Sequence, residues 1–221
     1  MIEHPVGKPV DPSTPTGEPA SIIEGEDVRL RRPDPADADA LFAATHGDAA
    51  SEGVWTYMAY GPWRDSRAMA GWIASTVDSA DPWWWTAERA GTPVGMAALL
   101  NRDEANRRVE IGHIWYAPTA QRTIANTEVA YLLLGESFDR LASRRVEWKC
   151  DALNERSRVA ALRLGFTFEG IFRNHMIVKG HNRDTAWYAM TDEEWPAARS
   201  RLEGWLYKTP REDGKPVRPL T

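Results

Sequence analysis

The sequence predicts one α/β domain in which a mixed, mostly antiparallel sheet is flanked by helices. Three strand-like segments joined by short turns, at 83–118, are typical of an antiparallel meander. An amphipathic helix over 127–141 and a strand over 145–151 follow, and such a crossover pairs strands in parallel. Because no internal repeat or second apolar unit is found, we expect three regions: a proline-rich extended arm (1–24), the domain (25–207) and a polar tail (208–221).

The first half of the domain is predicted to hold one strand and two helices. Apolar residues alternate with arginines around Leu30, which indicates a short strand. Asp34 and Asp37 are N-cap candidates for the first helix. An aromatic loop at 54–63 leads to a second helix that begins near Asp65.

The second half is richer in strands. A hairpin turn at Ala90–Gly91 joins the first two strands of the meander. Asn154 is an N-cap candidate, and Gly165 a C-terminal stop, for a helix after the strand at 145–151. The remaining expected elements are strands over 166–176 and 184–190, a turn at Lys179–Asn182, and a closing helix over 195–206.

Composition excludes several classes of protein. The net charge is −5 over 221 residues, which argues against a nucleic-acid binder. No apolar run reaches the ~18 residues of a membrane span, and the start of the chain lacks a signal-peptide core, so we expect a cytoplasmic protein without membrane contact. A single cysteine, Cys150, rules out an internal disulfide, and no trio of residues at ligand spacing predicts a metal.

Polar residues open two of the predicted helices. The loop at 121–126 precedes the helix at 127–141, and its free N–H groups together with Arg122 suit a phosphate. Spacing alone favours a plain cap and turn, because no glycine loosens the loop. Asn154 and Ser157 open the next helix. If the two strands are parallel neighbours, both helix starts lie at one sheet edge, where α/β sheets bind ligands. The alternatives for Asn154 and Ser157 are a helix cap and an ordinary first-turn serine.

Several motifs resemble the GCN5-related N-acetyltransferase (GNAT) superfamily, in its ribosomal-protein (Rim-type) branch. They are EIG (110–112), QRT (121–123) with TE (127–128), EWKCDALN (147–154), SRVAALRLGFTFEGIFR (157–173) and KGHNRDTAWY (179–188). WTY (55–57) and YGPW (60–63) fit the same branch. The resemblance implies a GNAT-type sheet with splayed central strands.

The resemblance also implies acetyl-CoA as a co-substrate, with no metal. Asn154 would contact the pantetheine, and Ser157 would lie near the thioester and act as a catalytic residue. The pantetheine arm would run along Ile114, Trp115 and Tyr116. The pyrophosphate would lie on Gln121, Arg122, Thr123, Ile124, Ala125, Asn126 and Thr127. One departure is that Ile124 and Asn126 stand where the family pattern has small residues, mainly glycine, which admit close backbone approach.

Acyl transfer to an amine needs a base, because an ammonium must lose its proton before it attacks. The candidates are Glu110, His113 and His175. Glu110 and His113 are three residues apart, so a regular strand places them on opposite faces, and only an irregular strand turns both toward a cleft. Structural roles remain open for all three. Cys150 falls on the apolar face of its strand, so we expect it to pack rather than carry an acyl group.

The resemblance places the acceptor beside the aromatic loop and the last hairpin. The candidate residues are Trp55, Tyr57, Tyr60, Trp63 and His175, whose alternative role is packing. The string His181–Asp184 fits a hairpin turn with a local Arg–Asp network. We therefore expect an N-acetyltransferase that acts on a small amine or a protein N-terminus by direct transfer, as a monomer or homodimer; the alternative is a non-catalytic acyl-CoA-binding or interaction module.

Overall fold

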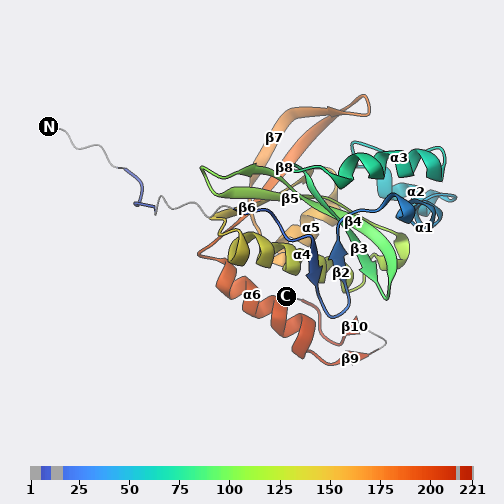
Figure 1. Cartoon of the computed structure of the whole chain (residues 1–221). Helices are drawn as coiled ribbons and strands as arrows, with labels where there is room; N and C mark the ends of the chain where they lie inside the picture. The colour runs from blue at the N-terminus through green and yellow to red at the C-terminus, as the bar shows by residue number, and fades with distance from the viewer. Residues whose placement is uncertain (1–5, 11–16, 213–214, 221) are drawn as a thin grey trace.

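The computed structural model describes residues 6–10, 17–212 and 215–220. Its centre is a mixed eight-stranded sheet in the order β1-β2-β3-β4-β5-β6-β8-β7 (Figure 1). Neighbouring strands are antiparallel except β5 and β6, which are parallel, so the predicted fold class is confirmed. The strands are β1 (Ile22–Glu24), β2 (Arg29–Arg31), β3 (Trp83–Arg89), β4 (Thr92–Asp103), β5 (Arg108–Tyr116), β6 (Arg145–Asp151), β7 (Thr167–Val178) and β8 (His181–Thr191).

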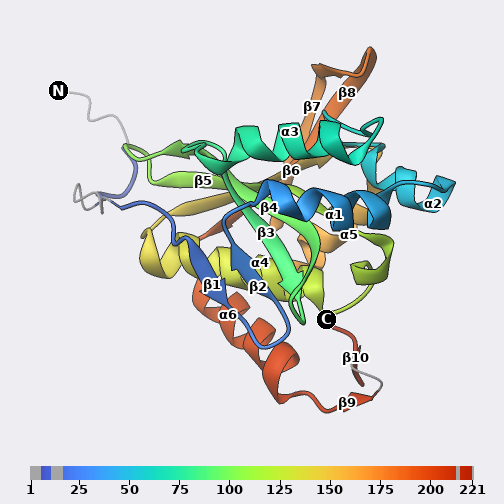
Figure 2. The same ribbon diagram turned by 45° about the vertical axis from the view of Figure 1, so that its right-hand side comes forward.

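Helices cover both faces of the sheet (Figure 2). One face carries α1 (Ala38–Thr45) and α3 (Ser66–Val77), with the short α2 (Ala49–Glu52) beside them. The other face carries α4 (Ala125–Gly135), α5 (Glu155–Leu164) and α6 (Trp195–Glu203). Single turns of 3-10 helix lie at Pro35–Asp37, Gly53–Trp55 and Pro118–Ala120, while π-helical turns at Glu136–Arg140 and Gly204–Lys208 extend α4 and α6.

Helix ends form where the capping residues predicted them. The Asp65 carboxylate accepts from Ala68 N at 2.7 Å and starts α3. The Asn154 side chain accepts from Ser157 N at 3.1 Å and starts α5. Gly165 ends α5 in the left-handed region, at φ 104°, which glycine adopts without steric cost.

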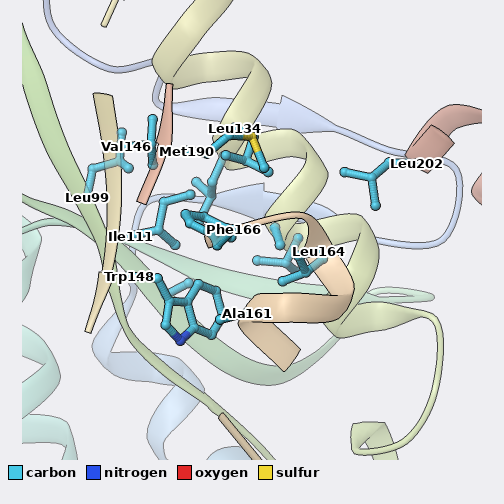
Figure 3. Close-up of a cluster of buried hydrophobic side chains, with 14 of the residues drawn as sticks. Leu99, Ile111, Leu134, Val146, Trp148, Ala161, Leu164, Phe166, Met190 and Leu202 are labelled. Atoms are coloured by element: carbon cyan, nitrogen blue, oxygen red, sulfur yellow. The ribbon is translucent and has the colours of Figure 1, made fainter. Parts of the chain in front are cut away.

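The larger core lies between the sheet and α4, α5 and α6 (Figure 3). Strand residues such as Ile111, Val146 and Trp148 interdigitate there with Leu134 and Leu164 from the helices. Each such side chain contributes roughly 1.5–3 kcal/mol by leaving water. The second core, under α1 and α3, is mainly aromatic, and it borders the cleft described below.

The chain ends take part in the fold more than expected. Residues 1–5 and 11–16 of the proline-rich arm lie outside the described part, but the arm's last residues form β1, so the sheet begins at Ile22. Ala20 N donates to Glu136 Oε1 at 2.6 Å, which joins the preceding segment to α4. In the predicted polar tail, Arg211–Glu212 (β9) pairs with Lys215–Pro216 (β10), and the Arg211 guanidinium binds Asp27 at 2.6 Å.

The hairpin of β7 and β8 is longer than the sequence indicated. Its turn is confined to Lys179 and Gly180, both in the left-handed region at φ 49° and 79°. Residues 181–183, predicted as turn and loop, continue β8, so the hairpin projects beyond the body of the domain (Figure 1). At its tip, the Lys179 ammonium donates to Trp55 O at 2.8 Å.

Candidate active site

A cleft opens where β5 and β6 diverge. The two strands are paired only from Arg108–Ile111 against 145–148, so the edge of β5 that faces β6 is free from Gly112 to Tyr116. The volume of the cleft is about 1060 Å³, and its walls come from β5, β6, α5, the β7–β8 hairpin and the loop at 57–59. The free strand edge is the pairing gap that an amide-bearing chain can fill.

A β-bulge accompanies the divergence. Trp115 pairs with Met96 and Gly112 with Ala98, so two residues of β5 oppose one of β4. The bulge includes His113, whose φ of 53° is rare for a residue other than glycine. It puts His113 against the rings of Trp84 and Tyr60, at 4.5 and 5.7 Å between centroids, on the face that carries Glu110. The strand is therefore irregular, and both residues line the cleft.

Burial weakens His113 as a base. Burial and, to a smaller extent, the nearby charge of Arg183 together lower the pKa of His113 to about 4. The ring is neutral at neutral pH, but its affinity for a proton is small. His113 is consequently a poorer acceptor for the proton of an ammonium than the sequence alone suggested.

Glu110 lies in a network of buried charges. It stands opposite Glu147 across the parallel pair, and the two carboxylates would repel each other. The Lys149 ammonium bridges them, at 2.9 Å from Glu110 Oε2 and 3.0 Å from Glu147 Oε2, and lies 3.8 Å above the centre of the Trp187 ring. Asn101 also donates to Glu110 Oε2, at 2.7 Å. The other oxygen, Oε1, accepts no hydrogen bond from the described residues.

Gly112 keeps the space beside Glu110 open. A Cβ at this position would lie 2.9 Å from the Leu100 side chain and 3.3 Å from Glu110 Oε1. An added Cβ would press on the end of the Leu100 side chain and crowd Oε1, and Glu110 itself lines the cleft.

Ser157 lies in the first turn of α5 with its hydroxyl oriented by Trp148. The indole Nε1 donates to Ser157 Oγ at 2.9 Å, so the hydroxyl hydrogen points elsewhere, and the Cys150 sulfur is near enough to accept it. Burial raises the pKa of the neighbouring Cys150 thiol, so this sulfur stays protonated. Asn154 is the helix cap, and it also lines the cleft, where its amide N–H₂ group remains available.

The start of α4 follows the free edge of β5. The N-cap residue is Ile124, whose side chain forms no hydrogen bond to the helix start. Ile124 itself has φ −64° and is almost fully buried, so its side chain points away from any group at the helix start. The left-handed residue of this loop is Arg122, at φ 57°. The Ile124 side chain is therefore packed inside the fold and does not cover the helix start.

Other residues predicted to bind the pyrophosphate form hydrogen bonds within the fold. The Gln121 amide donates to Tyr116 O at 2.9 Å, and Thr123 Oγ1 accepts from Ala125 N at 3.2 Å. Thr127 is fully buried and its hydroxyl oxygen accepts from Arg163 at 2.8 Å, so its side chain is not available to a ligand.

The cleft brings together seven of the predicted site residues: Tyr57, Glu110, His113, Ile114, Asn154, Ser157 and His175. The side chains of Trp115 and Tyr116 are buried in the two cores, which leaves only their backbone for a ligand. His175 Nδ1 lies 3.0 Å from Thr185 Oγ1 on the hairpin wall.

Three of the four aromatic residues predicted for the acceptor site take the alternative role of packing in or against the second core. Trp55 is 1% exposed and donates to Thr45 O at 3.2 Å. Its ring packs against Trp63 and Trp115, each 4.8 Å away between centroids. Tyr60 stacks behind His113 and does not line the cleft. These rings fill the second core, whereas Tyr57 alone of the four borders the cleft.

Sequence reasoning missed Asn101, Lys149, Arg183 and Trp187, which all line the cleft. Strand alternation in RVEWKCD places Lys149 on the face opposite Trp148, which is a usable signal. The expected Arg183–Asp184 pair is not formed: Asp184 accepts from Asn174 N at 2.7 Å and from the Asn182 amide at 3.0 Å.

The described residues contain neither a membrane-spanning helix nor a cluster of metal ligands. No helix there is long and apolar enough to cross a membrane. No three histidine, cysteine, aspartate or glutamate side chains of that part gather as a metal site would require.

The chain is similar to known acetyltransferases. A curated relative, the Bacillus subtilis protein named "Putative ribosomal N-acetyltransferase YdaF", is 33% identical over 105 residues, 48% of this chain, and the match spans 57% of that relative's length. A GCN5-related N-acetyltransferase from Brucella melitensis is 38% identical, with a TM-score of 0.88 over 94% of this chain and 96% of that one. A GNAT-family structure from Chromobacterium violaceum is 36% identical, with a TM-score of 0.75 over 86% and 100%.

The match to a family model covers most of the fold just described. The model of the acetyltransferase (GNAT) domain matches residues 27–167, from β2 through α4 to the start of β7. The chain belongs to the GNAT acetyltransferase family.

Proposed function

We propose that the chain is an acetyl-CoA-dependent N-acetyltransferase that transfers the acetyl group directly to a primary amine in a ternary complex. The observation that carries the proposal is the meeting, in one cleft, of the free β5 edge, the Ser157 hydroxyl and the unbonded oxygen of Glu110. Each meets one requirement of the reaction: donor alignment, stabilisation of the leaving group and removal of a proton.

The residues that would hold acetyl-CoA fit an extended, amide-bearing ligand with a phosphate end. Backbone groups of Gly112–Tyr116 lack a partner strand on the β6 side, and the Asn154 amide group is free to donate. The start of α4, where Thr123 engages only the first N–H group, suits the pyrophosphate together with Arg122. When bound, acetyl-CoA supplies the activated acetyl group as a thioester.

Glu110 is the proposed general base. Lys149 and Asn101 hold its Oε2, so Oε1 is left to accept the proton that the attacking amine loses. As the carbon–nitrogen bond forms and the carbon–sulfur bond breaks, the Ser157 hydroxyl is placed to stabilise the departing thiolate by a hydrogen bond, and the thiolate takes its proton from the amine through Glu110 or from water. The protonated Cys150 thiol is a weak nucleophile, which favours direct transfer over an acyl-cysteine.

The acceptor is proposed to be a small amine or a protein N-terminus. The word "ribosomal" in the name of the Bacillus subtilis relative favours a protein N-terminus, and the cleft is open enough to admit the first residues of a chain. We place Tyr57 and His175 beside the acceptor, because both line the cleft between the loop and the hairpin.

The experiment is thiol release from acetyl-CoA across a panel of amines and short peptides, with mass spectrometry of the products. Amine-dependent release with acetylated product is expected. Tight CoA binding without turnover on any amine would instead favour a non-catalytic acyl-CoA-binding module on the same scaffold.

A further inference from the structure

One cation in the cleft has no counter-charge. Arg183 lines the cleft from β8, and its guanidinium forms no ion pair or hydrogen bond with the described residues. Its Nε is buried without an acceptor, a condition that among the described arginines is shared only with Arg89, which is not on the cleft. A buried donor left unsatisfied costs about 1–3 kcal/mol. A ligand that accepts from Arg183 would remove this cost.

The neighbouring acids do not neutralise Arg183. Asp184, the next residue, bonds to Asn174 N and the Asn182 amide instead. Glu110 and Glu147 are both taken by Lys149. Among the described residues, four cations line the cleft. Arg102, Arg108 and Lys149 each pair with a carboxylate, whereas Arg183 forms no ion pair with the described residues.

Arg183 lies close to the place where transfer would occur. Its charge acts on the ring of His113 and on the Cys150 thiol, which line the cleft on β5 and β6. Residues two apart on a strand share a face, so Thr185 and Trp187 stand beside Arg183 on this wall. Trp187 Nε1 is a second buried donor without an acceptor. An incoming group that accepts several hydrogen bonds matches this wall.

We propose that Arg183 binds an anionic group, a carboxylate or phosphate, that the acceptor carries near its amine. The inference rests on the proposed function and narrows its acceptor class. A guanidinium presents a planar fork of donors that fits such oxyanions with two parallel hydrogen bonds. The same contact satisfies the buried Nε and removes the uncompensated charge, so a neutral acceptor binds less well.

The test uses acceptor pairs that differ only in charge. Suitable pairs are aspartyl and asparaginyl dipeptide amides, an amino acid and its amide, and phosphoethanolamine and ethanolamine. The wild type is expected to favour the anionic member of at least one pair by ~10-fold or more in kcat/KM, the effect of one charge-assisted contact. The pair with the largest preference identifies the anion as side-chain carboxylate, α-carboxylate or phosphate.

Three variants assign that preference to Arg183. Arg183→Gln is expected to abolish it through a higher acceptor KM, with the KM for acetyl-CoA unchanged. Arg183→Lys keeps the charge without the fork and is expected to retain part of the preference. Arg173→Gln, at an exposed arginine of β7 outside the cleft, is the matched control and is expected to behave as wild type.

Specific results would overturn the proposal. Equal use of both members of every pair by the wild type contradicts it, and so does an equal loss for both in Arg183→Gln. A raised KM for acetyl-CoA in that variant would assign Arg183 to the donor. If no amine is acetylated, the proposed function fails, and calorimetry of the same pairs with the CoA-bound protein decides the anion site separately: tighter binding of an anionic member, lost in Arg183→Gln, supports it, while equal or absent binding overturns it.

Discussion

The two halves of β5 differ in how they are paired. From Arg108 to Ile111 the strand has a partner on each side, and its apolar residues pack into the larger core. From Gly112 to Tyr116 the strand pairs with β4 alone, and the bulge at His113 makes the strand irregular. One strand therefore supplies both rigid support and a free edge. A functional cleft can arise from a local loss of pairing without an added loop.

The largest effect is expected where the two halves meet, at Glu110. Glu110→Gln should lower kcat by about 10²–10⁴-fold, the range for loss of a general base. Binding of acetyl-CoA, measured by calorimetry, should remain near that of the wild type. Glu104→Gln, which alters an exposed carboxylate at the rim of the same cleft, is the control and should retain activity. Near-normal kcat in Glu110→Gln would remove Glu110 as the base.

Gly95→Ala is designed to break the pairing of β4 with Gly112–Tyr116 of β5. A Cβ at Gly95 would overlap the backbone oxygen of Trp115, so β4 and β5 must separate. Unfolding in urea should show a loss of about 3 kcal/mol, at the upper end of the usual cost of overpacking. Gly71→Ala is the control on α3, where an added Cβ meets nothing within 4 Å, and helix propensity predicts a gain of ~0.5–1 kcal/mol. Equal stability of Gly95→Ala and wild type would contradict this account.

Ser157→Ala separates chemistry from binding at the free edge. Turnover should fall by roughly 10–100-fold, since one hydrogen bond to a developing charge is lost. The KM for acetyl-CoA should change little, and Ser157→Thr, which keeps a hydroxyl, should recover part of the rate. Unchanged turnover in the alanine variant would remove Ser157 from the catalytic residues.

The smallest effect concerns His113 and pH. The pKa of His113 is lowered to about 4 in the folded chain against about 6.5 unfolded, so the unfolded state binds more protons between these values. The associated stability is present above pH 6.5 and is lost as the pH falls toward 4. From pH 7 to pH 5 this amounts to about 2 kcal/mol.

The variant that tests this slope is His113→Asn, because asparagine tolerates a positive φ. Urea unfolding at pH 7 and pH 5 should show that this part of the pH dependence disappears. His181→Asn, at an exposed position of the hairpin, is the control and should keep the wild-type slope. A wild-type slope in His113→Asn would show that His113 does not titrate as described.

Local signals made much of the fold predictable. Asp65, Asn154 and Gly165 cap helices through their own side chain or backbone, so each could be identified without knowledge of the tertiary structure. The bulge was not predictable, because no glycine marks the positive φ at His113. The charge network was missed for another reason: the register of β5 against β6 is set across a long crossover, and it alone brings Lys149 to Glu110.

Packing explains why three of the predicted aromatic acceptor residues do not line the cleft. Trp55, Tyr60 and Trp63 are residue types that often line binding sites. Here the rings of Tyr60 and Trp63 pack against the ring of Trp55 in the second core. Arg183 lacks an ion pair because the Asp184 carboxylate accepts from Asn174 N instead. The neighbouring residues in the sequence did not indicate this direction of the Asp184 side chain.

Hydrogen exchange of backbone amides along β5, with and without CoA, tests the central claim most directly. The account predicts that CoA slows exchange in Gly112–Tyr116, where the strand edge is free, and leaves Arg108–Ile111, already paired on both sides, unchanged. Absence of protection at Gly112–Tyr116 in the presence of saturating CoA would contradict the claim that this edge receives the acetyl donor.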